Sequence, residues 1–163
     1  MTWYQSLIVA VLSGVSASLA TMWLSLKRFY RERWWQRRFD GCAAVIEAIH
    51  DMQRLSEIHW RETFLKSRYD EDWRKRASDR GADASRLLRR YADLGELALP
   101  LEVAKLLSSY VAETDRSREQ SYPVSYEEMI EEDKGREERL LLAIVPAAMK
   151  GLGLSRWQLF ANE

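Results

Sequence analysis

The sequence has 163 residues, in which 25 basic and 25 acidic side chains give a formal net charge of zero at pH 7. The charge is unevenly placed, because residues 27–90 hold 17 basic and 11 acidic residues and residues 91–163 hold 8 and 14. This asymmetry argues against simple nucleic-acid binding by the whole chain. The single cysteine, Cys42, excludes an intramolecular disulfide, in agreement with a reducing cytoplasm.

An uncharged segment dominates the start of the chain, because residues 3–26 contain no Asp, Glu, Lys or Arg. At about 1.5 Å per residue, a helix of this length reaches roughly 36 Å, enough to cross a hydrocarbon core of about 30 Å. Six basic residues follow between Lys27 and Arg38, and such residues stay on the cytoplasmic side of a membrane. We therefore expect a transmembrane anchor over residues 1–27, with the N-terminus outside, and a cytoplasmic α-helical domain over residues 28–163.

A cleavable signal peptide is the competing interpretation, because Ser18 and Ala20 are small enough for a cleavage site. A signal peptide has its basic residues before the apolar run, whereas residues 1–26 contain no Lys or Arg. The apolar run also continues beyond Ala20 to the basic residues, which favours an anchor that stays in the membrane.

Residues typical of a membrane surface occur at both ends of the uncharged segment. Tryptophan rings favour the headgroup region, and basic side chains attract anionic lipid, which explains the basic cluster without nucleic acid. Membrane lipid is therefore a predicted partner, and no nucleic acid is expected. The predicted anchoring residues are Trp3, Trp23, Lys27, Arg28, Arg31, Arg33, Trp34, Trp35, Arg37 and Arg38.

Small residues recur every four positions along the expected membrane helix, on two neighbouring stripes. Such stripes let helices approach closely, and packing of this kind drives helix association within lipid. An ordinary anchor that contains small residues explains the same pattern, and the sequence leaves both interpretations open. The stripes are Ala10, Gly14 and Ser18, and Ser13, Ala17 and Thr21.

The anchor is expected to continue as one helix into the cytoplasmic domain, with Gly41 as its first weak point. An apolar stripe at spacings of three and four residues then predicts a packing helix. The stripe consists of Trp35, Phe39, Cys42, Ile46 and Ile49. The charged residues 57–80 are also expected to be helical, and a turn is predicted around Ser78, Asp79 and Gly81.

The remaining helices are expected on either side of a polar loop. Pro100 suits the start of a helix, and the loop is predicted over residues 114–124. Ser125 and Glu128 match a capping box that opens a long last helix. Residues 140–149 are apolar nearly all round, which predicts burial within the domain or between subunits. No strand-like alternation occurs, so the fold class is all-α, with a bundle of about four to five helices after the anchor.

The chain shows no set of residues that predicts catalysis or metal binding. Glu47 and His50 have the spacing of a di-iron ligand pair, but such sites need a second copy, which the sequence lacks. His59 would lie about 13.5 Å from His50 along a helix, too far to share a metal ion. Phosphate-loop, zinc and nucleophile motifs are also missing. We therefore expect no enzyme, no metal site and no cofactor.

Two segments carry a resemblance to a group of proteins. They are RWWQRR at residues 33–38 and VIEAIHDM at residues 45–52. This combination of a tryptophan pair, basic residues and an Ile-Glu-Ala helix resembles small bacterial single-pass membrane-anchored helical proteins that have no assigned activity. The resemblance implies the bacterial inner membrane as the location and supplies no catalytic residue.

The predicted function is non-enzymatic: a protein anchored in the inner membrane that forms homo-oligomers or recruits a partner at the cytoplasmic face. The alternative is a membrane-acting effector, toxin-like or part of phage defence, whose oligomers perturb the bilayer. Three apolar residues near the C-terminus, Trp157, Leu159 and Phe160, are a possible partner surface. The two hypotheses differ in whether overproduction depolarises the cell.

Overall fold

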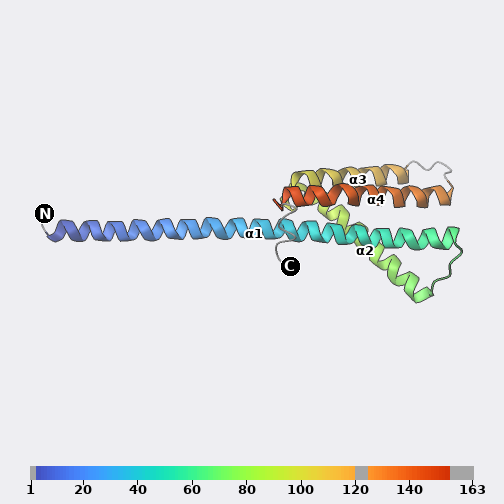
Figure 1. Ribbon diagram of the computed structural model, residues 1–163, viewed down its shortest axis with the longest axis horizontal. Coiled ribbons are helices and arrows are strands. Elements are labelled where there is room, and N and C mark those ends of the chain that lie inside the picture. The colour runs from blue at the N-terminus through green and yellow to red at the C-terminus, as the bar shows by residue number, and fades with distance from the viewer. Residues whose placement is uncertain (1–2, 120–124, 155–163) are drawn as a thin grey trace. The chain divides into compact units, whose positions relative to one another are not determined.

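The computed structural model describes residues 3–119 and 125–154, except for the side chains of residues 3–17 and Ala20. Every regular element in this part of the chain is helical, so the all-α prediction is confirmed (Figure 1). The chain divides into two compact units, Met1–Arg37 and Arg38–Glu163. The elements are α1 (Trp3–Phe64), α2 (Glu71–Leu94), the short 3-10 helix η1 (Gly95–Leu97), α3 (Leu101–Glu119) and α4 (Tyr126–Gly151).

The described part of the chain leaves out most side chains of the first twenty residues. Within it, no helix combines the length and the apolarity that a bilayer crossing requires.

Helix α1 runs without a break from Trp3 to Phe64, as predicted, and it does not weaken at Gly41. A Cβ atom at Gly41 would lie 2.8 Å from the backbone oxygen of Ala98 and 3.3 Å from side-chain atoms of Leu99 and Tyr91. The glycine therefore serves close packing of α1 against the segment between α2 and α3, and the prediction of a weak point was wrong.

The core of the second unit is built from apolar side chains of all four α-helices. Val45 and Ile49 of α1, Leu88 of α2, Leu107 of α3 and Ile144 of α4 are each at most 2% exposed. Figure 1 shows α3 and α4 side by side and antiparallel. Helix α2 runs diagonally across the C-terminal part of α1. Burial of such apolar side chains supplies most of the stability of short amphipathic helices.

The break between the first two helices lies at a different place from the predicted one. Residues 65–70 connect α1 to α2 although helix was expected there, and α2 continues through the predicted turn at Ser78, Asp79 and Gly81. A Cβ atom at Gly81 would lie 2.4 Å from Cδ2 of Leu55, so this glycine marks the point where α2 crosses α1. The second error arises because a glycine inside a helix gives the same local signal for close packing as for a turn.

Helix α3 begins directly after Pro100, as predicted, and continues beyond its predicted end. Residues 114–119, expected in a loop, are helical. Two side-chain interactions stabilise this extension: Asp115 forms an ion pair with Arg89 of α2, and the Thr114 hydroxyl donates a 2.8 Å hydrogen bond to the carbonyl oxygen of Tyr110. The ion pair with α2 and this local hydrogen bond outweigh the polar, aperiodic character of the segment.

Helix α4 has the predicted capping box and only part of the predicted burial. The Glu128 amide donates to Oγ of Ser125 at 3.2 Å, and the Ser125 amide donates to Oε2 of Glu128 at 3.3 Å. Within residues 140–149, Leu140 and Ile144 are buried, whereas Leu142 is 72% exposed. Burial within the domain is therefore confirmed for one face of α4 only, and burial of the other face between subunits stays a prediction.

Candidate functional site

Residues 21–37 of α1, all of them exposed, form an apolar and aromatic surface. The large apolar side chains on it, together with Leu19, have exposed fractions of 42% to 67%. Exposed apolar surface of this extent marks a site that contacts lipid or another protein. Its large apolar residues are Leu19, Met22, Trp23, Leu24, Leu26, Phe29, Tyr30, Trp34 and Trp35. Trp35, like Phe39 at 39% exposed, was expected in the packed stripe, and that prediction was wrong.

Basic side chains are interleaved with these rings. Nζ of Lys27 lies 5.0 Å from the ring centroid of Trp23, and Cζ of Arg33 lies 4.9 Å from that of Phe29. The ion pair between Arg28 and Glu32, at 2.9 Å, is exposed on both sides and contributes little stability. The segment therefore presents cations beside aromatic rings, a combination suited to a membrane surface.

The structure describes only some of the predicted membrane and partner residues. Ser18 and Thr21 of the small-residue stripes are exposed on α1, and Arg38 is half-buried at the start of the second unit. The side chains of Trp3, Ala10, Ser13, Gly14 and Ala17 lie outside the described part, as do residues Trp157, Leu159 and Phe160.

A buried charged cluster on α4 was not predicted from the sequence. Arg136 is 4% exposed and Glu137 is 2% exposed. The Arg136 guanidinium pairs with Glu132 at 2.8 Å, with Asp133 at 2.9 Å and, from α3, with Glu113 at 3.4 Å. A signal was present in the sequence, because Glu137 follows Ile130 by seven residues and precedes Leu140 by three, which places it within the apolar stripe.

Glu137 is held in an environment that disfavours its charge. Oγ of Ser56, on α1, donates a 3.0 Å hydrogen bond to its Oε1, and its Oε2 has no hydrogen-bond partner among the described residues. Burial raises the pKa of Glu137 to about 7, with a further contribution from the nearby charge of Asp133. Burial likewise raises the pKa of the neighbouring Tyr110 to about 12. The cluster therefore binds or releases a proton near neutral pH, inside the helical domain.

Glu47 and His50 are both exposed and line a groove of about 850 Å³ between α1 and α2. In the described ranges, no three His, Cys, Asp or Glu side chains are grouped closely enough to hold a metal ion. Cys42 is buried, and burial raises the pKa of its thiol to about 11, so the thiol remains protonated and unreactive at neutral pH.

Comparison with known proteins adds no family assignment. No protein-family model, curated protein or solved structure matches this chain. A function for the chain must therefore be argued from its surfaces and its buried groups.

Proposed function

We propose that this chain is a non-enzymatic protein of the bacterial inner membrane. In this proposal residues 1–27 form the transmembrane anchor, and residues 28–163 lie on the cytoplasmic side, where they form oligomers or recruit a partner. The observation that carries the proposal is the exposed apolar surface of α1, from Leu19 to Trp35.

The energetic argument rests on the size of that surface. Full burial of one large apolar side chain is worth about 1.5–3 kcal/mol, and nine such side chains are left exposed on α1 between Leu19 and Trp35. A hydrocarbon and headgroup environment covers them on all sides of the helix, whereas a neighbouring helix covers one face only. In the sequence, the absence of charged residues extends from Leu26 back to Trp3.

The basic residues favour one orientation of the anchor. Between Lys27 and Arg37 there are five basic residues and one acidic residue, Glu32, so this segment carries a net charge of +4. Each basic residue near an anionic membrane surface contributes about 1 kcal/mol of attraction. Together they favour a cytoplasmic position for the segment that follows the anchor.

Replacing Gly14 and Ser18 together by leucine is expected to convert an oligomer of the full chain into a monomer. The added side chains would hold the membrane helices apart, so the packing between them would be lost. Mass measured by light scattering in mild detergent reports the change. A matched control, Val11→Leu with Val15→Leu, enlarges residues outside both stripes and should leave the mass unchanged.

The same measurement separates the two forms of the proposal. An oligomer that persists in the Gly14→Leu, Ser18→Leu variant would remove the membrane helix as the site of association. A monomeric wild-type chain that co-purifies with one companion protein in stoichiometric amount would support partner recruitment. A monomeric wild-type chain that co-purifies with no companion protein would contradict both oligomer formation and partner recruitment.

A further inference from the structure

A cavity lies beside the point where α2 crosses α1, close to the contact between Gly81 and Leu55. Its volume is about 210 Å³, and it lies entirely within the second unit. Asp51, Arg54 and Leu55 line it from α1, and Trp73, Arg76 and Arg80 line it from α2. We call this space the arginine cavity.

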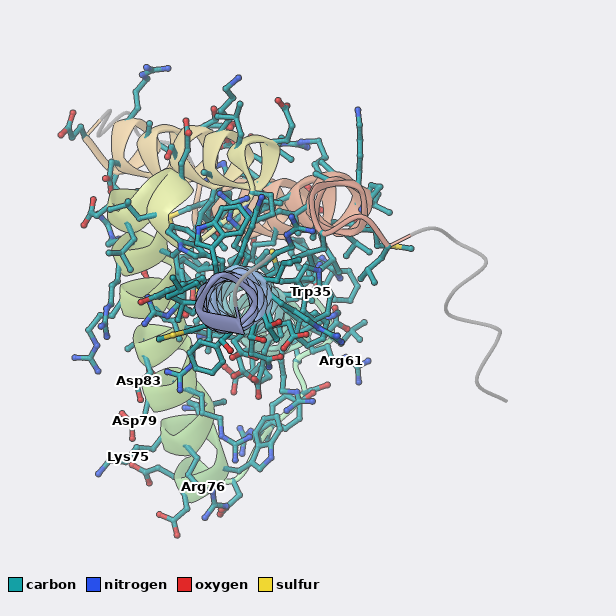
Figure 2. All side chains as sticks on the ribbon, turned by 90° about the vertical axis from the view of Figure 1, so that its left-hand side faces the viewer. Trp35, Arg61, Lys75, Arg76, Asp79 and Asp83 are labelled. Carbon is teal, nitrogen blue, oxygen red and sulfur yellow. The ribbon has the colours of Figure 1, made fainter. Side chains whose placement is uncertain are left out.

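Three exposed arginines line the arginine cavity, and one carboxylate offsets only part of their positive charge. None of its three arginines forms an ion pair or a hydrogen bond with a described residue, whereas Arg61 and Arg74, nearby, are each paired with a glutamate. Figure 2 shows Asp79 and Asp83 in a row with Lys75 along one edge of α2, apart from Arg76. Asp51 is the only carboxylate in the lining, so three positive charges and one negative charge leave a net charge of +2.

Converging arginines favour a particular kind of anion. The guanidinium group is planar and donates two parallel hydrogen bonds, a geometry that matches phosphate and carboxylate oxygens. Mutual repulsion between the three arginines also falls when a multiply charged anion lies between them. A phosphate or diphosphate group satisfies both conditions and fits a cavity of this volume, which is smaller than the pocket of a whole drug-sized ligand.

A larger groove adjoins the arginine cavity and shares Arg54 and Trp73 with it. Its volume is about 570 Å³, and its lining includes Ile58 and Tyr69. The rings of Tyr69 and Trp73 are stacked, with centroids 4.7 Å apart and an angle of 22° between their planes. Trp73 is 37% exposed, so an aromatic surface is open to a ligand directly beside the arginines.

We propose that the cytoplasmic helical domain binds a small organic phosphate at this place. Its phosphate groups lie among Arg54, Arg76 and Arg80, and its ring system lies against Tyr69 and Trp73 in the adjoining groove. The ligand class is a nucleoside phosphate or a molecule of similar chemistry. Binding would add a contact between α1 and the N-terminal half of α2, beside the Gly81 crossing and the ion pair between Arg74 and Glu62.

The test is calorimetric titration of the full chain, in a neutral detergent, with ADP and with inorganic diphosphate. Both probes are expected to bind at one site, and ADP is expected to bind more tightly because its base contacts Tyr69 and Trp73. Arg76→Ala and Arg80→Ala should each weaken both probes by about tenfold, the loss expected for a charge-assisted hydrogen bond. Trp73→Leu should weaken ADP and leave diphosphate unchanged.

The control variant is Arg90→Ala, which removes an exposed arginine of the same helix outside the cavity and should bind both probes as the wild type does. Thermal unfolding by circular dichroism checks that each variant is folded. Absence of saturable binding by the folded wild-type chain would overturn the proposal, as would equal losses in Arg90→Ala and Arg76→Ala. Short-chain phosphatidylglycerol is the probe for a lipid headgroup. If it displaces ADP and binds more tightly, the site binds a lipid headgroup and the proposal of a soluble ligand is wrong.

Discussion

Ile144→Ala is expected to lower the free energy of unfolding of the helical domain by about 2–5 kcal/mol. Ile144 is 0% exposed and packs in the centre of the core from α4. The substitution removes buried apolar area and leaves a cavity, because the surrounding helices relax only partly. Thermal unfolding in mild detergent should show a fall in Tm of about 10 °C or more.

The matched control lies two residues away on the same helix. Leu142 is 72% exposed, so Leu142→Ala removes few contacts and should change the free energy of unfolding by less than about 1 kcal/mol. Equal losses for the two variants would contradict the described orientation of α4. A large loss for Leu142→Ala alone would place the core on the opposite face of the helix.

Glu137→Gln is expected to stabilise the domain at pH 8 and to have a much smaller effect at pH 5. The pKa of Glu137 rises from its ordinary value of 4.5 to about 7 in the folded state, chiefly because the side chain is buried. Between these two values the folded state holds a proton that the unfolded state has released, so stability falls as the pH rises. Above pH 7 the full cost, about 3–4 kcal/mol at about 1.4 kcal/mol per pKa unit, is present, and glutamine removes it.

The measurement is the free energy of urea unfolding of both proteins at several pH values from 5 to 8. The difference between variant and wild type should grow from pH 5 to about pH 7 and level off above it. Oγ of Ser56 can donate to the glutamine oxygen as it does to Oε1 of Glu137, so the variant keeps this hydrogen bond. A difference that is the same at pH 5 and at pH 8 would show that Glu137 does not titrate in this range.

Local signals in the sequence predicted those parts of the fold that depend on local chemistry. Pro100 at the start of α3 and the Ser125–Glu128 capping box at the start of α4 each act within one helical turn, and both predictions were confirmed. Gly81 was misinterpreted because its role depends on Leu55, a residue of another helix. Whether a glycine permits a turn or a helix crossing is decided by tertiary contacts that no local pattern contains.

The candidate sites also divide into those that a local sequence pattern predicts and those that depend on tertiary contacts. The exposed surface of α1 follows from a run of apolar and basic residues that the sequence displays directly. Glu137 was not singled out in the sequence, because the neighbouring acidic residues hide its place in the apolar stripe. The arginine cavity was not predicted because its residues come from two helices, and their convergence depends on where α2 crosses α1.

Membrane retention of the full chain tests the central claim most directly. Membranes from bacterial cells that produce the wild-type chain, and a variant with Leu12→Arg and Val15→Arg, are washed with high salt and then with alkaline carbonate. The account predicts that the wild-type chain stays in the membrane through both washes, whereas the variant is released, because each arginine near the centre of the span costs about 2.5–3.5 kcal/mol. Release of the wild-type chain by high salt alone would show that only the basic residues hold it at the surface, and would contradict the transmembrane anchor.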